Sequence, residues 1–179
     1  MQLYTIGHST HTQEEFLALL QEYKIEILVD IRRFPGSKHV PWFNQENMEK
    51  WLPDHGIQYI HLKELGGKRG KNKDIDESLI AGWENTFFRN YASYSLTDDY
   101  DKGIEGLISL SQKATLVYMC SEAVPWRCHR LFVSNTLVTE GHLVYHIMSK
   151  TKVIKHELGM YGADPEIKNH KIIYPSRPR

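Results

Sequence analysis

Short apolar runs of strand length alternate with helical segments along most of this chain, and this alternation restricts its fold more than any other feature. The runs that predict strands lie at residues 2–6, 26–31, 57–62, 114–119 and 142–148. Strands joined through helices imply right-handed crossovers and a mostly parallel sheet that is covered on both faces. We therefore expect an α/β fold, with three layers and an open, mostly parallel sheet of about five strands with helices on both faces.

The helices are predicted by apolar residues at helical spacing and by capping residues. They are expected at residues 12–23, 44–52, 76–112 and 128–139. Thr12, with Glu15 three residues later, predicts a capping box for the first helix, and Asn44 is the expected cap of the second, which Pro53 and Gly56 should end. A break is expected near Ser95 in the third segment.

The length and composition are those of an ordinary globular protein. At 179 residues the chain fits one domain, with a core at residues 1–150 and a polar tail at 151–179 that we expect to pack loosely or extend. The 22 basic and 22 acidic side chains give a net charge of zero, so nucleic acid or anionic lipid would need a local patch. No signal peptide or membrane-spanning run is present, which predicts a cytoplasmic protein without a membrane partner.

Polar residues follow each of the first four predicted strands. Open parallel sheets bind ligands beyond the carboxyl ends of their strands, so these residues should share one rim. They include His8 after the first strand, Asp30, Arg32 and Ser37 around the end of the second, His61, Gly66 and Gly67 around the third, and residues 120–130 after the fourth.

Residues 120–130 hold both cysteines, and they lie between a strand and a predicted helix start. Helix N-termini favour anions and thiolates, so Cys120 is a candidate nucleophile, although a buried strand residue would look the same. Cys128 is at least as well explained as a packed residue of the first helical turn. The spacing from Cys120 to Arg127 is one residue too long for the tyrosine-phosphatase signature, so the loop is not assigned to that class.

The remaining candidates each have a structural alternative. Glu122 can serve as a general base or can form an ion pair with Arg127 or Arg130. His8 can be a catalytic imidazole or part of a helix cap, and Asp30, in an apolar strand, needs a charged or hydrogen-bonding partner.

A metal site would combine Cys120, Cys128 and His129 with His8 or His61. Seven residues separate the cysteines, however, more than structural zinc sites use. We therefore expect no metal and no cofactor.

A basic loop follows the third strand. Its cations Lys63, Lys68, Arg69 and Lys71 are candidate nucleic-acid contacts, although such runs are also common in solvated loops. Gly66-Gly67-Lys68 lacks the spacing of a P-loop.

Several motifs together resemble the family of bacterial and archaeal proteins described as domain of unknown function 488. The motifs are Thr5-Ile6-Gly7-His8-Ser9-Thr10, Leu28-Val29-Asp30-Ile31-Arg32 with Pro35 and Ser37, Gly56-Ile57-Gln58-Tyr59, Leu65-Gly66-Gly67, Tyr91-Ala92, and Cys120-Ser121-Glu122 with Pro125 and Cys128-His129-Arg130. The last is the most specific of them. The resemblance implies an α/β sandwich with a polar pocket at the strand ends, and it implies no particular reaction.

These observations predict an enzyme, a hydrolase or transferase acting on an anionic small molecule or nucleic acid that carries phosphate. The candidate catalytic residues are Cys120, Glu122, His8 and Asp30. The candidate substrate-binding residues are Arg32, Ser37, His61, Gly66, Gly67, Arg127, Cys128, His129 and Arg130. One alternative is a nucleic-acid-binding or regulatory module without turnover, and a weaker one is a thiol-redox or metal-binding protein.

Overall fold

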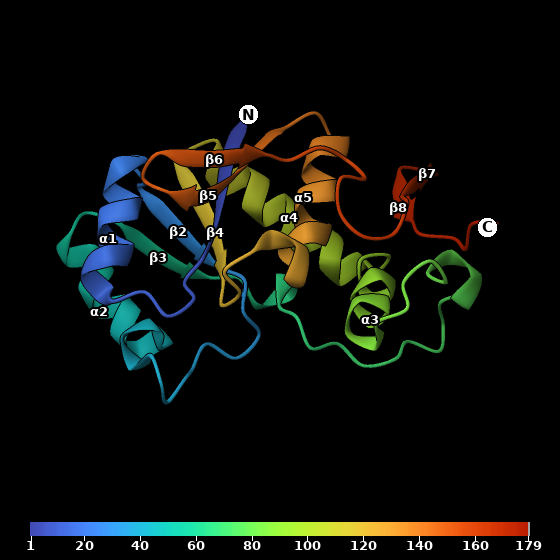
Figure 1. The fold of residues 1–179 in the computed structure, drawn as a ribbon, viewed down its shortest axis with the longest axis horizontal. Helices are drawn as coiled ribbons and strands as arrows, with labels where there is room; N and C mark the ends of the chain where they lie inside the picture. Colours follow the sequence, from blue (N-terminus) through green and yellow to red (C-terminus); the bar gives the residue numbers. More distant parts are fainter. Residues whose placement is uncertain (179) are drawn as a thin grey trace.

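A six-stranded sheet lies between two layers of helices in the computed structural model, which describes residues 1–178 (Figure 1). The strand order is β3-β2-β4-β1-β5-β6, and all neighbours are parallel except β5 and β6. The strands are β1 (Gln2–Gly7), β2 (Ile27–Asp30), β3 (Gln58–His61), β4 (Leu116–Cys120), β5 (Leu143–Ser149) and β6 (Lys152–Lys155). A separate hairpin consists of β7 (Glu166–Lys168) and β8 (Lys171–Ile173).

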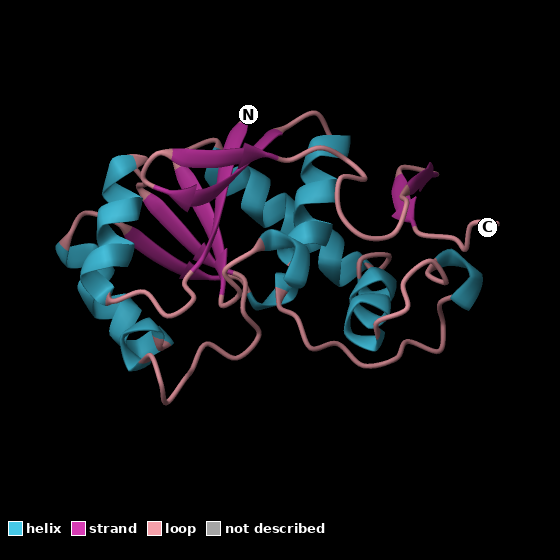
Figure 2. Ribbon diagram, in the orientation of Figure 1, coloured by secondary structure: helices cyan, strands magenta, loops and turns pink. Residues whose placement is uncertain are grey.

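Five α-helices cover the two faces of this sheet (Figure 2). They are α1 (Gln13–Glu22), α2 (Gln45–Asp54), α3 (Thr86–Tyr94), α4 (Asp98–Ser111) and α5 (Arg130–Thr139). The buried residues of α1 and α2 pack on one face, and those of α3, α4 and α5 pack on the other. The predicted α/β architecture is confirmed, with one strand more than expected.

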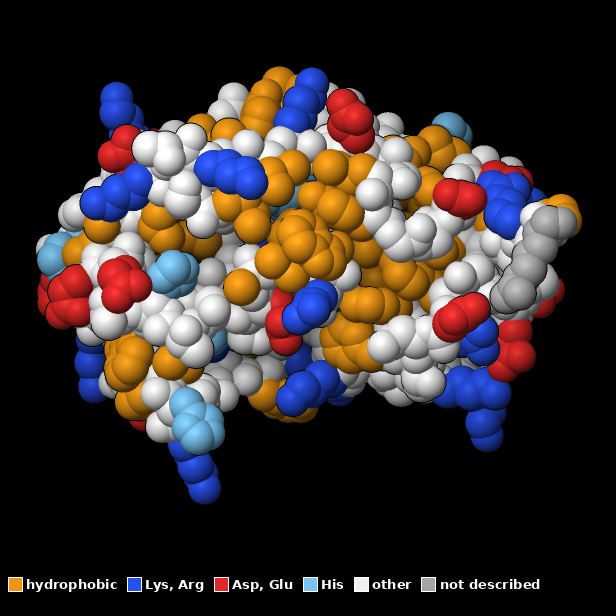
Figure 3. Space-filling view, viewed as in Figure 1, with side chains coloured by type: hydrophobic (Ala, Val, Ile, Leu, Met, Phe, Trp, Pro, Cys, Tyr) orange, Lys and Arg blue, Asp and Glu red, His pale blue; other side chains and the backbone are white. Residues whose placement is uncertain are grey.

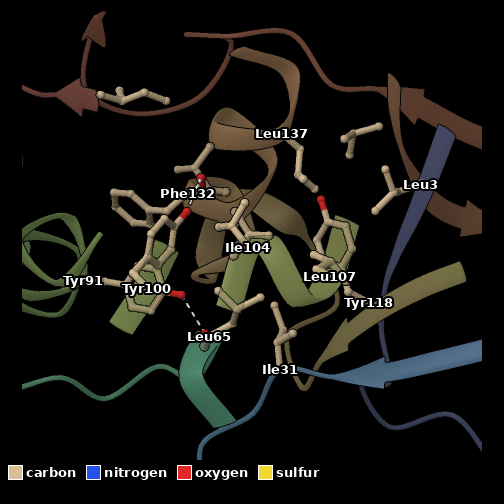
Figure 4. Packing of buried hydrophobic residues seen from close by; sticks show 14 of the residues in the cluster. Leu3, Ile31, Leu65, Tyr91, Tyr100, Ile104, Leu107, Tyr118, Phe132 and Leu137 are labelled. Atoms are coloured by element: carbon tan, nitrogen blue, oxygen red, sulfur yellow. Dashed lines mark hydrogen bonds between the residues drawn. The ribbon is translucent and has the colours of Figure 1, made fainter. Parts of the chain in front are cut away.

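The larger of the two cores lies between the sheet and the helices α4 and α5 (Figure 4). Leu3 of β1 and Tyr118 of β4 meet Ile104 of α4 and Leu137 of α5 there, and all four are at most 2% exposed. Burial of such side chains stabilises the fold by roughly 1.5–3 kcal/mol each. Together with the second core under α1 and α2, this packing covers both faces of the strands.

The helix ends agree with the capping signals in part. Thr12 and Thr97 accept from backbone N–H groups three residues later, as N-caps do. Asn44 precedes α2 but gives it no side-chain cap, because its Oδ1 accepts from the backbone N–H of Ser37 at 2.6 Å. The helix also continues through Pro53 to Asp54, so Pro53 does not end it.

The helix predicted from residue 76 is wrong in its first part. Residues 76–85 contain only the 3-10 turn Glu77–Leu79, and α3 begins after Asn85, whose Oδ1 accepts from Phe88 N–H at 3.2 Å. The backbone of Gly82 instead donates to the carbonyl of Tyr174 at 2.7 Å. Pairing with the distant C-terminal segment therefore replaces helical hydrogen bonds here.

The expectation of a loosely packed tail is wrong at a few positions, although most side chains of residues 151–178 are exposed. The chain after Ser149 turns back as β6, and His156 behind it is 2% exposed. Further on, Tyr174 packs its ring against Trp83 and Phe132 and is 1% exposed. A few buried side chains thus anchor a segment whose average polarity suggested otherwise.

No helix among residues 1–178 is both long enough and apolar enough to cross a membrane.

Candidate functional site

A cavity of about 540 Å³ opens at the carboxyl ends of β1, β2 and β4. Its lining comes from the loops that follow these strands, from the basic loop after β3 and from the start of α3. The lining residues are His8, Arg32, Arg33, Phe34, Gly36, Ser37, Gly67, Lys68, Asn85, Phe87, Phe88, Cys120, Ser121, Glu122, Arg127, Cys128 and His129. The predicted convergence of polar groups from several strand ends is therefore present in the fold.

Gly7 allows the loop after β4 to cross the end of β1. Gly7 pairs with Cys120 in the parallel register, and a Cβ atom at Gly7 would lie 1.6 Å from the carbonyl oxygen of Glu122. Any larger residue would displace that loop. The close approach lets both strands contribute to one pocket.

Asp30 and Arg32 form a buried ion pair on the side of the sheet that faces α2. Arg32 Nε and Nη2 donate to the two carboxylate oxygens of Asp30 at 2.9 and 2.7 Å, and Tyr59 donates its hydroxyl to the same carboxylate at 2.5 Å. A second Nη2 contact reaches the carbonyl of Phe43 at 2.6 Å. Asp30 is 0% exposed, so it lies beneath the pocket and does not line it. Its need for a partner was predicted, and Arg32 is that partner.

His8 is held as a neutral imidazole by this pair. Its Nδ1 donates to the carbonyl of Ser9 at 2.8 Å, which leaves Nε2 to accept from Arg32 Nη1 at 3.2 Å. Burial, together with the charge of Arg32, lowers the pKa of His8 to about 4. The ring also stacks on Phe43 with centroids 4.5 Å apart. His8 therefore presents an oriented, uncharged ring to the cavity.

Arg130 organises the side of the pocket that faces α5. Its Nε donates to Cys120 Sγ at 3.0 Å, its Nη1 to Thr5 Oγ1 at 2.8 Å and its Nη2 to the carbonyl of Glu122 at 2.8 Å. At 1% exposure the guanidinium is a structural cation behind the cavity. The sequence predicted Arg130 as a substrate contact, but the structure places it outside the pocket lining.

Cys128 and Cys120 differ in their readiness to ionise. Burial opposes the thiolate of Cys128, but the adjacent Cys120 thiol and Arg130 outweigh it and lower its pKa to about 7. The backbone N–H of Arg130 also donates to Cys128 Sγ at 3.3 Å. Burial raises the pKa of Cys120 well above its usual value. The electrostatics thus favour the thiol that the sequence had ranked second.

His129 lies beside Cys128 and joins the two sides of the site. Its Nε2 donates to the carbonyl of Ile31 at 2.6 Å, so the free Nδ1 faces Cys128 Sγ at 3.7 Å. Burial lowers the pKa of His129, which favours the neutral ring. A Cβ atom at Gly67 would come within 3.0 Å of His129 Nδ1, so the glycine leaves room for this arrangement.

Glu122 and Arg127 reach the cavity without the ion pairs considered from the sequence. Neither residue forms a salt bridge within residues 1–178, and both side chains are exposed at the cavity wall. Arg130 binds the backbone carbonyl of Glu122 and leaves its carboxylate free. An acid and a cation are therefore both available to a ligand.

The basic loop after β3 only partly reaches the pocket. Lys68 lines it, whereas Arg69 donates to the carbonyls of Gly66 and Lys63 and stacks on Tyr94. A surface salt bridge pairs Lys71 with Glu77 at 2.9 Å. These contacts leave fewer free cations than the sequence suggested.

Two other predicted substrate-binding residues support the lining from outside it. His61 Nε2 donates to the carbonyl of Arg32 at 2.7 Å, which fixes the loop after β2. A Cβ atom at Gly66 would lie 2.7 Å from the backbone of Arg33. Ser37 does line the cavity, where its backbone is held by Asn44.

Sequence reasoning missed the wall that the start of α3 supplies. Asn85, Phe87 and Phe88 lie far from the other site residues in the chain, within a stretch predicted as continuous helix. The cap signal of Asn85 could have located the helix start, but nothing local indicates that it faces the cavity.

No cluster of three or more His, Cys, Asp or Glu side chains among residues 1–178 is arranged to hold a metal ion.

Comparison with known families identifies the chain. A family model described as "Domain of unknown function DUF488" matches residues 12–137, more than half of the sequence. The chain belongs to the DUF488 family. The match spans α1 to most of α5, and it includes Asp30, Arg32 and residues 120–130 but not His8 or the strands after α5. No curated protein and no solved structure matched the chain.

Proposed function

We propose that this DUF488 protein is an enzyme that acts on a phosphate-bearing substrate, a nucleotide or a nucleic acid, with Cys128 as its reactive thiol. The observation that carries the proposal is the position of Cys128, whose thiol has a pKa near 7 and lines a cavity bordered by free cations. A thiolate is the nucleophilic form of cysteine, and this pKa makes it abundant at neutral pH.

The surroundings of Cys128 support a nucleophilic role. The backbone N–H of Arg130 and the buried guanidinium stabilise negative charge on its sulfur, while His129 Nδ1 is an acceptor on the same side. Charge stabilised by fixed donors in a water-poor site costs little reorganisation during a reaction. Cys120, whose pKa is raised, supports Cys128 as a neutral thiol.

The charges around the cavity support an anionic substrate. Arg32, Arg33, Lys68 and Arg127 line it, and Glu122 is the one carboxylate in the lining. Guanidinium and ammonium groups are the usual partners of phosphate oxygens. Figure 3 shows basic side chains beside an extended apolar area on the face viewed.

The aromatic wall supports a nucleotide within this substrate class. Phe87 and Phe88 line the cavity, and a Cβ atom at Gly67 would lie 3.2 Å from the Phe87 ring. Nucleobases stack on aromatic side chains, with a gain of roughly 1–3 kcal/mol per base. A substrate with a phosphate and a base would use both kinds of surface.

The alternative of a binding module without turnover receives less support. In that alternative the basic loop after β3 would bind the nucleic acid, but Arg69 and Lys71 of this loop already form contacts within the protein. Binding to DNA or RNA through this loop should fall steeply with salt if it occurs. Gel retardation at low and high salt measures this directly.

The experiment compares wild-type protein with Cys128→Ser and Cys120→Ser against nucleotides, phosphoesters and short oligonucleotides. Wild type should turn over at least one compound, and Cys128→Ser should lose that activity by more than Cys120→Ser. The matched control is Lys150→Gln, a change at an exposed lysine in the turn after β5. Binding without turnover would favour the module, and neither binding nor turnover would reject both functions.

A further inference from the structure

A chain of buried hydrogen bonds leads from Arg130 across the sheet to the C-terminal segment. Thr5 Oγ1 lies 2.8 Å from Arg130 Nη1 and 2.7 Å from His146 Nδ1. The chain continues from His146 Nε2 to His156 Nδ1 at 2.9 Å, and from His156 Nε2 to Asn135 Oδ1 at 2.8 Å. Each of these five side chains is at most 2% exposed.

The sheet register brings the members of this chain together. Thr5 of β1 is the direct neighbour of His146 on β5, and both face α5 together with Leu3 and Val144. On the next strand His156 follows β6, which returns antiparallel to β5. The contacts therefore depend on the edge of the sheet that forms after α5.

Only one assignment of donors and acceptors along this series gives every shared proton an acceptor. Arg130 can only donate, so the Thr5 hydroxyl accepts from it and in turn donates a hydrogen bond to His146 Nδ1. His146 Nε2 then donates to His156 Nδ1, and His156 Nε2 donates to Asn135 Oδ1. The opposite direction would leave the Thr5 proton without a partner in a site closed to water, which costs about 1–3 kcal/mol.

This direction requires both histidines to be neutral. A proton on either ring would place two donors face to face within the chain. Burial lowers the pKa of His146 to about 2, aided by repulsion from a proton on His156 and from the Arg130 guanidinium, and burial lowers that of His156 to about 4. The two histidines are therefore neutral at neutral pH, which keeps this hydrogen-bond direction fixed.

We propose that Thr5, His146 and His156 are positioning residues that hold the Arg130 guanidinium against Cys120 and behind Cys128. Arg130 Nη1 has Thr5 as its acceptor, while Nε and Nη2 already contact Cys120 Sγ and the carbonyl of Glu122. Without the Thr5 hydroxyl the guanidinium would keep its contacts with Cys120 and Glu122 but lose its third anchor, so its charge would be held less firmly behind the Cys128 thiolate. The inference rests on the role of Cys128 proposed above.

The three positioning residues lie outside the family match, which covers residues 12–137. Arg130, which they hold, lies inside it. Parts of the chain before α1 and after α5 thus complete a site whose reactive residues are in the matched region.

The test measures the pH at which Cys128 becomes half-maximally reactive toward iodoacetamide, with the modified residue identified by mass spectrometry. Thr5→Val keeps the shape of Thr5 and removes its hydroxyl, whereas Thr5→Ser keeps the hydroxyl. Thr5→Val should raise the midpoint by ~0.5–1 pH unit, a loss of roughly 0.7–1.4 kcal/mol of thiolate stabilisation. Thr5→Ser should leave the midpoint near that of wild type.

His146→Leu removes the hydrogen-bond acceptor of the Thr5 hydroxyl and should shift the alkylation midpoint of Cys128 in the same direction. The control His142→Gln lies just before β5 and contacts the N-terminal amine, and it should have no effect. Circular dichroism establishes that each variant is folded.

The inference would be overturned if folded Thr5→Val alkylates Cys128 with the same pH midpoint as wild type. It would also be overturned if Thr5→Ser shifts the midpoint as much as Thr5→Val, because the effect would then come from packing and not from the hydroxyl. The alkylation readout needs no substrate, so it separates the two proposals. Wild type without turnover would reject the proposed function even if the midpoint moved, and turnover with an unmoved midpoint would reject the positioning role alone.

Discussion

Replacement of Asp30 by Asn should destabilise the fold through the charge that it leaves behind. Arg32 is 7% exposed and loses its only ion-pair partner within residues 1–178, while Tyr59 loses a charged acceptor. Breaking a buried pair on one side costs ~3–5 kcal/mol, because the remaining charge stays desolvated. For a chain of this length each kcal/mol lowers Tm by roughly 2–4 °C, so the expected decrease is about 6–20 °C.

Urea denaturation followed by circular dichroism measures the free energy of unfolding directly. The matched control is Asp54→Asn at the exposed end of α2, which should stay within about 0.5 kcal/mol of wild type. A double variant, Asp30→Leu with Arg32→Met, removes both charges. It should be no less stable than Asp30→Leu alone, since no unpaired charge remains.

Two results would refute this reasoning. One is an Asp30→Asn protein within about 1 kcal/mol of wild type, which would mean that water or another group compensates Arg32. The other is a double variant clearly less stable than Asp30→Leu, which would mean that the guanidinium stabilises the fold through its other contacts with Phe43 and His8.

Three further predictions concern the loops and the histidines. Gly7→Ala should destabilise by ~2 kcal/mol or more in urea denaturation because its Cβ would overlap the Glu122 carbonyl, whereas Gly70→Ala, with open space around it, should be near neutral. Tyr59→Phe should cost about 1.5–3 kcal/mol in the same assay, since it removes a hydrogen bond to a carboxylate. Stability should decrease as pH falls from about 6.5 to 4, because the unfolded chain binds protons that native His8 and His156 exclude. The expected slope is up to ~1.4 kcal/mol per pH unit for each histidine, and His156→Gln should reduce it while the exposed His39→Gln should not.

The strands and most helices could be predicted because local patterns determine them. Apolar runs located β1 to β5, and Thr12 marked the start of α1 through a hydrogen bond that spans three residues. The C-terminal strands and the loop at residues 76–85 depend instead on distant partners, such as the bond between Gly82 and Tyr174. Such pairings carry no periodic signal in the sequence.

The sequence predicts which residues lie together at the site, but it does not predict which side chains contact one another. Carboxyl ends of parallel strands must lie together, so His8, Arg32 and Cys120 were placed correctly at one rim. Nothing in the sequence indicates that Arg130 would turn its guanidinium away from the cavity toward Thr5. The sequence likewise does not indicate which cysteine has the lower pKa, because this depends on the burial, hydrogen bonds and charges around each sulfur.

The cations of the site fall into two groups with different physical roles. Arg32 and Arg130 are buried on opposite sides of the sheet, and most of their N–H groups donate to protein acceptors. They are therefore fixed charges that set the potential of the cavity without rearranging around a ligand. Lys68 and Arg127 line the cavity and form no salt bridge within residues 1–178, so their side chains can follow a substrate. If Arg130 lowers the pKa of Cys128 while Lys68 and Arg127 bind phosphate, neutralising Arg127 should weaken substrate binding and leave the alkylation midpoint of Cys128 unchanged.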